Sequence, residues 1–215
     1  MVLTVADGDG RRQRRRRETI EEIRQAALEA MSEDGVAGMS LSDVARRIGI
    51  RPPSLYVYFP SKLAMYDDLF ALGFRRMNET LEQATDPTSR GLDALRHGMR
   101  VYVGWCLENP VLAQLMFWRP VPGFEPSEES YRLSIANVEL IGVAIAKAVA
   151  AGDLSDAALS EEGLTLISVV GAGVVSQQLS NEPSAGFADG RFSRYAAEAL
   201  DMWIARYTPV PKGPR

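Results

Sequence analysis

One short stretch constrains this chain more than any other, because it ends one helix sharply and starts another at once. It spans residues 40–62 and reads SLSDVARRIGIRPPSLYVYFPSK. Apolar residues at helical spacing predict a helix that begins after Ser40 and ends at Gly49, since glycine tolerates the left-handed backbone of a helix C-terminus. Pro52 and Pro53 suit the first turn of the next helix, where the N–H groups they lack would have no partner. Two short helices joined by a tight turn are therefore predicted.

The second short helix has an apolar inner face and an outer face that carries aromatic residues. Leu55 and Phe59 lie four residues apart and form the inner face, which leaves Tyr56 and Tyr58 outside. Phenol hydroxyls donate to phosphate oxygens, and their rings can pack on sugars or thymine methyls, so the outward tyrosines favour contact with DNA. The alternative is that both tyrosines pack against a neighbouring helix. A helix-turn-helix of this kind places its second helix in the DNA major groove.

Longer helices flank this stretch. Periodic apolar residues predict a helix over 19–34, which supplies the third wall of a small three-helix head. A long helix is predicted to start after Ser61, its N-cap, and to end at Asp86-Pro87. Ser40 and Asp43 resemble a capping box for the first short helix.

These motifs resemble a known family of regulators. The residues that carry the resemblance are Gly49, Ile50, Pro53, Ser54, Leu55, Tyr56, Tyr58, Phe59, Ser61 and Lys62. They resemble the signature of the tetracycline-repressor (TetR) family over about residues 19–69, although Tyr58 stands where the family often has His. The resemblance implies an all-α fold, with an N-terminal helix-turn-helix head that binds DNA and a C-terminal helical domain that binds a ligand and dimerises.

The resemblance also implies which side chains face DNA. The set nearest the base edges is Ser42, Arg51, Pro52, Pro53, Ser54 and Val57, and the set that faces the phosphate backbone is Ser40, Tyr56, Tyr58 and Lys62. Val57 offers only an apolar contact, so we expect Ser42, Arg51 and Ser54 to carry most of the polar readout.

The net charge of −4 suits a DNA-binding protein only because the charge is unevenly distributed. Residues 1–62 carry 11 Lys and Arg against 9 Asp and Glu, whereas the rest of the chain carries 13 against 19. Six cations directly precede the first helix: Arg11, Arg12, Arg14, Arg15, Arg16 and Arg17. We expect residues 1–17 to be disordered in the free protein. Two roles stay open for them, a basic arm that contacts the DNA backbone or minor groove and a solvated tail.

Composition argues against several other classes of protein. The single Cys106 and the single His97 cannot supply a disulfide or a zinc site of Cys and His, and nine residues of separation place them on opposite faces of a helix. Together with the lack of a phosphate loop or a nucleophile elbow, this predicts no enzyme, no metal and no cofactor. No unbroken apolar run reaches the roughly 18 residues of a membrane span, so we expect a cytoplasmic protein without a membrane partner.

The remainder of the chain predicts helices only. They are expected at 89–108, 110–118, 127–151, 156–180 and 189–207, between breaks rich in Pro and Gly. The predicted domains are a disordered basic arm (1–17), a helix-turn-helix domain (18–62), an effector-binding and dimerisation domain (63–208) and a disordered tail (209–215). Residues 109–128 resemble a TetR subset with a Pro-Gly-Phe loop.

The last two predicted helices have the composition of a dimer interface. Gly163, Gly171 and Gly173 all fall in one of them, and each glycine costs about 1 kcal/mol of helix stability relative to Ala. This favours a close approach of another backbone, although both helices could equally form the core of one chain. The resemblance implies a homodimer through these helices, and hence a roughly palindromic operator in double-stranded DNA.

Aromatic and sulfur-containing side chains gather in the middle helices and could line a cavity for an apolar or aromatic effector. The candidates are Phe70, Phe74, Met99, Tyr102, Trp105, Cys106, Met116, Phe117 and Trp118, with His97, Tyr102, Cys106 and Gln114 as polar groups. The same spacing is typical of plain core, so both interpretations stay open. The predicted function is a ligand-responsive homodimeric repressor, and the alternative is a DNA-binding protein without a small-molecule ligand.

Overall fold

The structure, a computed structural model, describes residues 6–85, 89 and 91–210, and every regular element in this part of the chain is helical. The α-helices are α1 (Ala6–Asp34), α2 (Leu41–Arg47), α3 (Pro52–Leu55), α4 (Lys62–Ala84), α5 (Leu92–Glu108), α6 (Pro110–Trp118), α7 (Glu128–Ala150), α8 (Glu161–Asn181) and α9 (Ala196–Tyr207). Three 3₁₀ turns join them: η1 (Val36–Gly38), η2 (Asp156–Leu159) and η3 (Ser193–Tyr195). The all-α prediction is confirmed.

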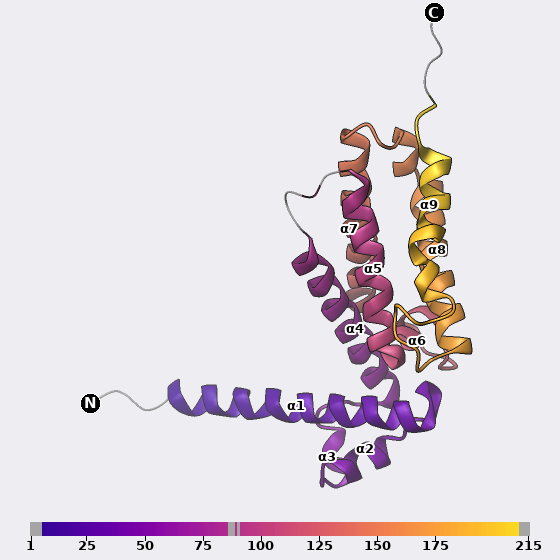
Figure 1. Ribbon diagram of the computed structural model, residues 1–215. Helices are drawn as coiled ribbons and strands as arrows, with labels where there is room; N and C mark the ends of the chain where they lie inside the picture. The colour runs from indigo at the N-terminus through magenta and orange to yellow at the C-terminus, as the bar shows by residue number, and fades with distance from the viewer. Residues whose placement is uncertain (1–5, 86–88, 90, 211–215) are drawn as a thin grey trace, which may run out of the picture.

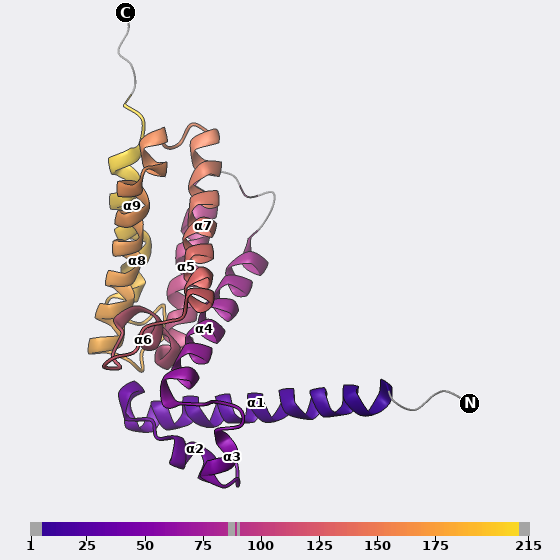
Figure 2. The same cartoon turned by 180° about the vertical axis from the view of Figure 1, so that it is seen from behind.

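The helices form a head, α1 to α3, and a body, α4 to α9. Figure 1 shows α1 lying crosswise below the upright helices of the body, with α2 and α3 on the far side of α1. The helix α4 leaves the head and rises into the body, and the view from behind in Figure 2 shows α5 and α7 beside it and α8 and α9 on the other flank. The α4 helix packs against both α5 and α7, so it connects the head to the centre of the body.

A shared apolar core fixes the three helices of the head. Ile23 and Ala27 of α1, Val44 of α2 and Leu55 of α3 are fully buried in it. The turn between α2 and α3 follows the prediction, because Gly49 has a left-handed backbone with φ +71°. The α2 and α3 helices are too short to be stable alone, so tertiary packing holds them in place.

The helix α3 is shorter than its sequence pattern suggested. It ends at Leu55, and turns follow over residues 56–58. The N–H of Phe59 still donates to the carbonyl of Leu55 at 3.0 Å, so Phe59 remains on the inner side and is buried. The inward assignment of Leu55 and Phe59 therefore survives a break in the helix, whereas the outward assignment of Tyr58 is wrong, because its ring is half-buried against the core.

One of the two predicted caps is wrong and one is confirmed. The Ser40 side chain makes no cap hydrogen bond to α2. Asp43, its expected capping partner, accepts from Nε of Arg47 at 2.6 Å, because a charge-assisted bond to a guanidinium is stronger than one to a backbone N–H. Ser61 does cap α4, since its Oγ accepts from the N–H of Ala64 at 3.0 Å.

The helix α1 starts much earlier than predicted, and this corrects the expectation of a disordered arm. Residues 6–17 continue α1 without a break, while residues 1–5 lie outside the described part. Arginine is a good helix former, and Arg14 pairs with Glu18 one turn later at 3.6 Å. The arm is therefore the first half of a helix.

Two boundaries in the body also differ from the prediction. The helix expected at 156–180 is divided into η2 and α8, because Ser160 is extended and its Oγ accepts from the N–H of Gly163 at 3.2 Å to start a new helix. The last α-helix begins only at residue 196, since Oε1 of Gln178 accepts from the N–H groups of Phe192 and Ser193, both at 3.0 Å, and holds that stretch as a turn followed by η3. The predicted break at Asp86-Pro87 and residues 211–215 of the tail lie outside the described residues.

Both α7 and α8 are long and apolar enough to cross a membrane by length and composition alone. In this structure they pack into the body, where Ile145 and Ala148 of α7 and Ile167 and Val175 of α8 are buried. Apolar helices of this kind also occur in the cores of helical proteins, so the finding is weak support for a membrane span.

Adjacent carboxylates on α4 bind the head on one side and the body on the other. Asp68 accepts two hydrogen bonds from Arg24 of α1, from Nε and Nη2, both at 2.7 Å. Asp67 accepts from the N–H and the Oγ of Ser127 at the start of α7, at 2.7 and 2.8 Å. The same turn of α4 therefore fixes the positions of both α1 and α7.

We expect Tyr66→Phe to destabilise the protein without changing its shape. The buried Tyr66 hydroxyl donates to the carbonyl of Val36 at 2.6 Å, and burial raises the pKa of Tyr66 to about 12. Loss of this donor leaves a buried carbonyl unpaired, so the free energy of unfolding in urea should fall by about 1–3 kcal/mol. The control is Tyr195→Phe at an exposed tyrosine, which should change it by less than about 0.5 kcal/mol. Equal effects of the two substitutions would contradict a structural role for the Tyr66 hydroxyl.

Candidate nucleic-acid interface and effector cavity

The helix-turn-helix presents an outer surface with unusual exposed side chains. Tyr56 is 53% exposed and Val57 is 68% exposed, although neither is a typical surface residue. The other predicted base-facing and backbone-facing residues that are exposed are Ser40, Ser42, Arg51, Pro52, Pro53 and Ser54. A surface that reads base edges needs hydrogen-bond donors and apolar groups. The small polar residues and Arg51 supply the donors, and Tyr56 and Val57 supply the apolar groups.

Two predicted backbone contacts, Tyr58 and Lys62, are half-buried and already have partners. The guanidinium carbon of Arg16 lies 5.3 Å from the ring centre of Tyr58, which also packs against the core. The ammonium of Lys62 donates to the carbonyl of Ala37 at 3.0 Å. The two tyrosines therefore differ, since Tyr56 faces outward whereas Tyr58 packs within the head.

The basic arm lies beside this surface. All six of its arginines are exposed, and the stacking of Arg16 on Tyr58 joins the arm to the residues just after α3. Behind the surface, Arg47 binds Asp43 and Glu33 and lowers the pKa of both carboxyl groups. The negative charges of those carboxylates are therefore compensated by arginine within the head. The arm adds a cluster of positive charges at the edge of the head.

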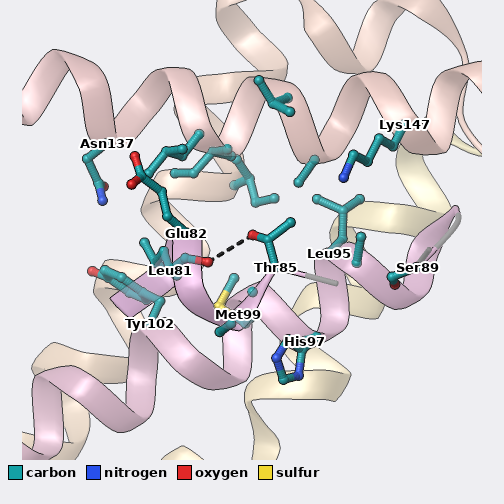
Figure 3. A pocket seen from close by; sticks show the side chains of 18 of the residues that line it. Leu81, Glu82, Thr85, Ser89, Leu95, His97, Met99, Tyr102, Asn137 and Lys147 are labelled. Carbon is teal, nitrogen blue, oxygen red and sulfur yellow. Dashed lines mark hydrogen bonds between the residues drawn. The ribbon is translucent and has the colours of Figure 1, made fainter. Parts of the chain in front are cut away.

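A cavity of about 580 Å³ lies in the body between α4, α5 and α7. Figure 3 shows Tyr102 and Asn137 toward one end of it and Lys147 and Ser89 toward the other. Asn137 and Lys147 are ten residues apart on α7, so the cavity extends about 15 Å along that helix. Its walls combine aliphatic side chains with several polar ones, and Glu82, Thr85 and His97 lie between the two ends. The elongated shape suits an elongated, largely apolar molecule.

The sequence prediction found only part of this cavity. Of the nine candidates, Met99 and Tyr102 line it, while Phe117, Trp118 and again Tyr102 line a second cavity of about 370 Å³. The remaining candidates are buried in the core and line neither of these two cavities: Phe70, Phe74, Trp105, Cys106 and Met116. Of the candidate polar groups, His97 lines the larger cavity and Gln114 lines neither.

Sequence reasoning missed the wall that α7 contributes. Its residues are Asn137, Leu140, Ile141, Val143, Ala144 and Lys147. Positions 137, 140, 141 and 144 follow helical spacing and mark one face of α7, but such a pattern does not distinguish a face that meets other side chains from one that borders a cavity.

A buried pair of amides joins α4 to α7 next to the cavity. Nδ2 of Asn137 donates to Oδ1 of Asn78 at 2.8 Å, and Nδ2 of Asn78 donates to the carbonyl of Leu133 at 3.0 Å. Both amides are buried, so this contact is costly to break without a replacement partner.

The chemistry of Cys106 does not suggest catalysis. Burial raises the pKa of the Cys106 thiol to about 12, so the thiol stays protonated near neutral pH. Among the described residues, no group of three or more His, Cys, Asp and Glu side chains could hold a metal ion.

Comparison with known proteins identifies the head. Residues 23–69 match the family described as "Bacterial regulatory proteins, tetR family". Over these residues the chain is similar to that family. Regulators of this family are DNA-binding transcription factors rather than enzymes.

The similarity extends beyond the TetR-family head in both sequence and fold. The HTH-type transcriptional regulator Rv1816 of Mycobacterium tuberculosis is 27% identical over 150 residues, which cover 65% of this chain and 63% of that protein. The matched segment thus spans less than two thirds of that relative. Among solved structures, a protein with unknown function from Rhodococcus sp. RHA1 gives a TM-score of 0.72 at 22% identity, covering 88% of this chain and 95% of that one.

A further solved structure of similar fold is a complex with a ligand. The transcriptional regulator FadR from Bacillus subtilis, in complex with stearoyl-CoA, gives a TM-score of 0.67 at 14% identity, covering 86% of this chain and 98% of that chain. At these identities the structural comparisons show a common fold, in which a small helical head is followed by a larger helical body.

Proposed function

We propose that the protein is a homodimeric, ligand-responsive repressor whose two heads bind a roughly palindromic operator in DNA. The observation that carries the proposal is the outer surface of the helix-turn-helix, where Tyr56 and Val57 are exposed next to Arg51. The TetR-family match over the same residues supports this assignment. Such a regulator would act in the cytoplasm, where it meets double-stranded DNA.

In this proposal the exposed residues have separate roles. Ser42, Arg51 and Ser54 donate to base edges, and the Val57 side chain contacts a thymine methyl. The Tyr56 hydroxyl donates to a phosphate oxygen and positions the head. We assign Lys62 and Tyr58 a supporting role, because both side chains already have partners within the head.

We propose that two copies associate through α8 and α9. The exposed apolar side chains on these helices include Val169 of α8, 60% exposed, and Met202 of α9, 76% exposed. Large exposed apolar side chains favour an interface with another protein surface, and TetR-family regulators act as dimers. Gly173, on an exposed part of α8, would allow the close backbone approach that the sequence suggested.

We further propose that the chain belongs to the TetR subset with a Pro-Gly-Phe loop, at residues 122–124. Phe124 is buried, with its ring centre 5.9 Å from that of Tyr66 and 6.2 Å from that of Phe70. Gly123 has φ +73°, which a side chain would disfavour. The loop thus fixes the connection between α6 and α7 to the same part of α4 that contacts the head.

The proposed effector is an elongated apolar molecule that binds in the larger cavity. Leu81, Glu82 and Thr85, near the C-terminal end of α4, line that cavity, whereas Asp68 near the other end binds α1. A ligand that separates α4 from α7 would therefore also displace the head. The acyl-CoA complex of FadR, which shares the fold, supports a cavity of this type.

The energetic requirement for such a switch is modest. The ligand must bind more tightly to the conformation in which the two heads are not spaced to bind the operator. A coupling of ~1–3 kcal/mol changes operator affinity by roughly 5–150-fold. The alternative is a DNA-binding protein without a small-molecule ligand. Release of DNA on ligand addition favours the first function, and DNA binding that no ligand alters favours the second.

Selection of bound sequences from a random duplex pool tests the DNA-binding proposal. Wild-type protein at near-physiological salt should enrich a palindromic motif. Arg51→Ala should relax the preferred base at one position in each half-site, a loss of about 1–3 kcal/mol of discrimination. The matched variant Tyr56→Phe removes only a hydroxyl and should weaken all sequences alike. Retention of DNA without an enriched motif would instead indicate charge-driven coating.

Removal of residues 1–17 tests the arm. If its arginines contact phosphates, the slope of log affinity against log salt should become less steep by about 0.9 for each lost contact. The control is Arg132→Ala, which removes an exposed cation that pairs with Glu128 on α7, far from the head in sequence, and should leave the slope unchanged. An unchanged slope after trimming would make the arm a solvated extension.

Met202→Glu tests the proposed dimer interface. A carboxylate buried between two copies without a partner should convert the dimer to monomers, as measured by light scattering during gel filtration. Ile135→Glu, at a side chain on α7 that is 47% exposed, places the same charge outside α8 and α9 and should leave a dimer. The reverse outcome would place the interface on α7.

A further inference from the structure

We infer that Tyr102 is a partition between two cavities and sets the length of ligand that the larger cavity accepts. The inference rests on the proposed function, because it concerns the effector of the same cavity. It assigns this residue a role in ligand selectivity, and it names the ligand class as unbranched amphipathic molecules with an alkyl chain.

The first observation is that the two cavities meet at one side chain. Of the described residues that line the larger cavity of about 580 Å³ and the smaller one of about 370 Å³, Tyr102 alone lines both. The side chain is half-buried, and the smaller cavity that it lines is also bordered by the exposed Val169 and Trp118, so that cavity opens to the surface.

The second observation is the order of contacts along α8. The larger cavity touches α8 at Ile167 and Ser168, and the smaller cavity touches it at Val169, Ala172, Gly173, Val175 and Ser176. Ser168 and Ala172 are four residues apart, about 6 Å along the helix. The smaller cavity therefore begins beside the larger one and continues along the next turns of α8.

The third observation places the ring of Tyr102 between those turns. A Cβ atom added to Gly171 would lie 3.0 Å from Cε1 of Tyr102 and 3.6 Å from Cε of Met99. The ring thus lies directly against the backbone of α8 at Gly171, between Ser168, which lines the larger cavity, and Ala172, which lines the smaller one. On its other side, Phe117 packs edge-on with a distance of 6.0 Å between ring centres.

The ligand class follows from the two ends of the larger cavity. Burial raises the pKa of Tyr102 well above its ordinary value, so the ring closes one end as a neutral group. Figure 3 shows Lys147 toward the other end, and among the described lining residues it is the only Lys or Arg. The carboxylates of Glu82 and Asp93 also line the cavity and would repel an anion. An anionic head group would therefore have to bind close to Lys147. An alkyl chain that ends at Tyr102 with a carboxylate near Lys147 fits this arrangement.

The test measures the affinities of n-alkanoates from octanoate to octadecanoate by titration calorimetry, with n-alkanols of the same lengths as neutral probes. For wild-type protein, each methylene that gains burial should tighten binding about fourfold until the chain reaches Tyr102. Chains longer than this limit should bind no more tightly.

Four variants separate the partition from general effects on the cavity. Tyr102→Ala joins the cavities, so the gain per methylene should continue to longer chains. Gly171→Ala places a Cβ atom 3.0 Å from the Tyr102 ring, which must shift, so the chain length at which the gain stops should change. Tyr102→Phe keeps the ring and should keep the wild-type limit. Leu95→Ala enlarges the larger cavity at another wall and should alter the affinity for all lengths without moving the limit.

The outcomes distinguish this inference from the proposed function on which it rests. A length limit that is the same in all five proteins would overturn the partition while leaving the cavity as an effector site. Wild-type protein that binds none of the probes but retains its DNA motif would overturn the ligand class and the partition with it. Each variant should still bind that motif, which shows that it has folded, since none of the substituted residues lies in the head.

Discussion

The ionic contact between Asp68 and Arg24 determines where the head lies relative to the body. Its neighbour Asp67 binds Ser127 at the start of α7, so one turn of α4 fixes helices on both sides. Bidentate pairs between a guanidinium and a carboxylate are directional as well as strong, so they fix an angle in addition to a distance. The remainder of the arrangement depends on this turn, because α1 carries the helix-turn-helix and α7 forms a wall of the larger cavity.

The same helix has its other end in the larger cavity. From Asp68 to Glu82 the axis of α4 runs about 21 Å, and the buried pair of Asn78 and Asn137 lies between these points. Coupling between distant sites can be carried by a chain of packed and hydrogen-bonded groups that has discrete arrangements. A single helix that is hydrogen-bonded to α1 near one end, to α7 in the middle and exposed to a cavity near its C-terminus provides such a connection.

What the sequence could predict depended on whether a feature was local. Gly49 and Pro52 determine the turn of the head through their own backbone preferences, so the turn was predicted correctly. Tertiary contacts decided the rest. The aromatic Phe70 was a reasonable cavity candidate, but it packs in the core, whereas ordinary aliphatic residues such as Leu140 line the cavity. The apolar pattern of one helix does not predict which of its faces borders a cavity. The arm was missed for the opposite reason, because composition suggested disorder while helix propensity and an ion pair at Glu18 favour a helix.

The helical form of the arm has a consequence for the kinetics of DNA binding. A disordered arm would lose about 1–2 kcal/mol of backbone entropy for every residue that became ordered on DNA. A helix that is already formed, and joined to the head by the stacking of Arg16 on Tyr58, avoids most of that loss. Its arginines also keep a fixed spacing of about 1.5 Å per residue along the axis. For a protein that binds DNA through this head, the arginines of the arm would contact phosphates only where the phosphate positions match their fixed spacing. Complexes in another register would make fewer contacts and dissociate quickly.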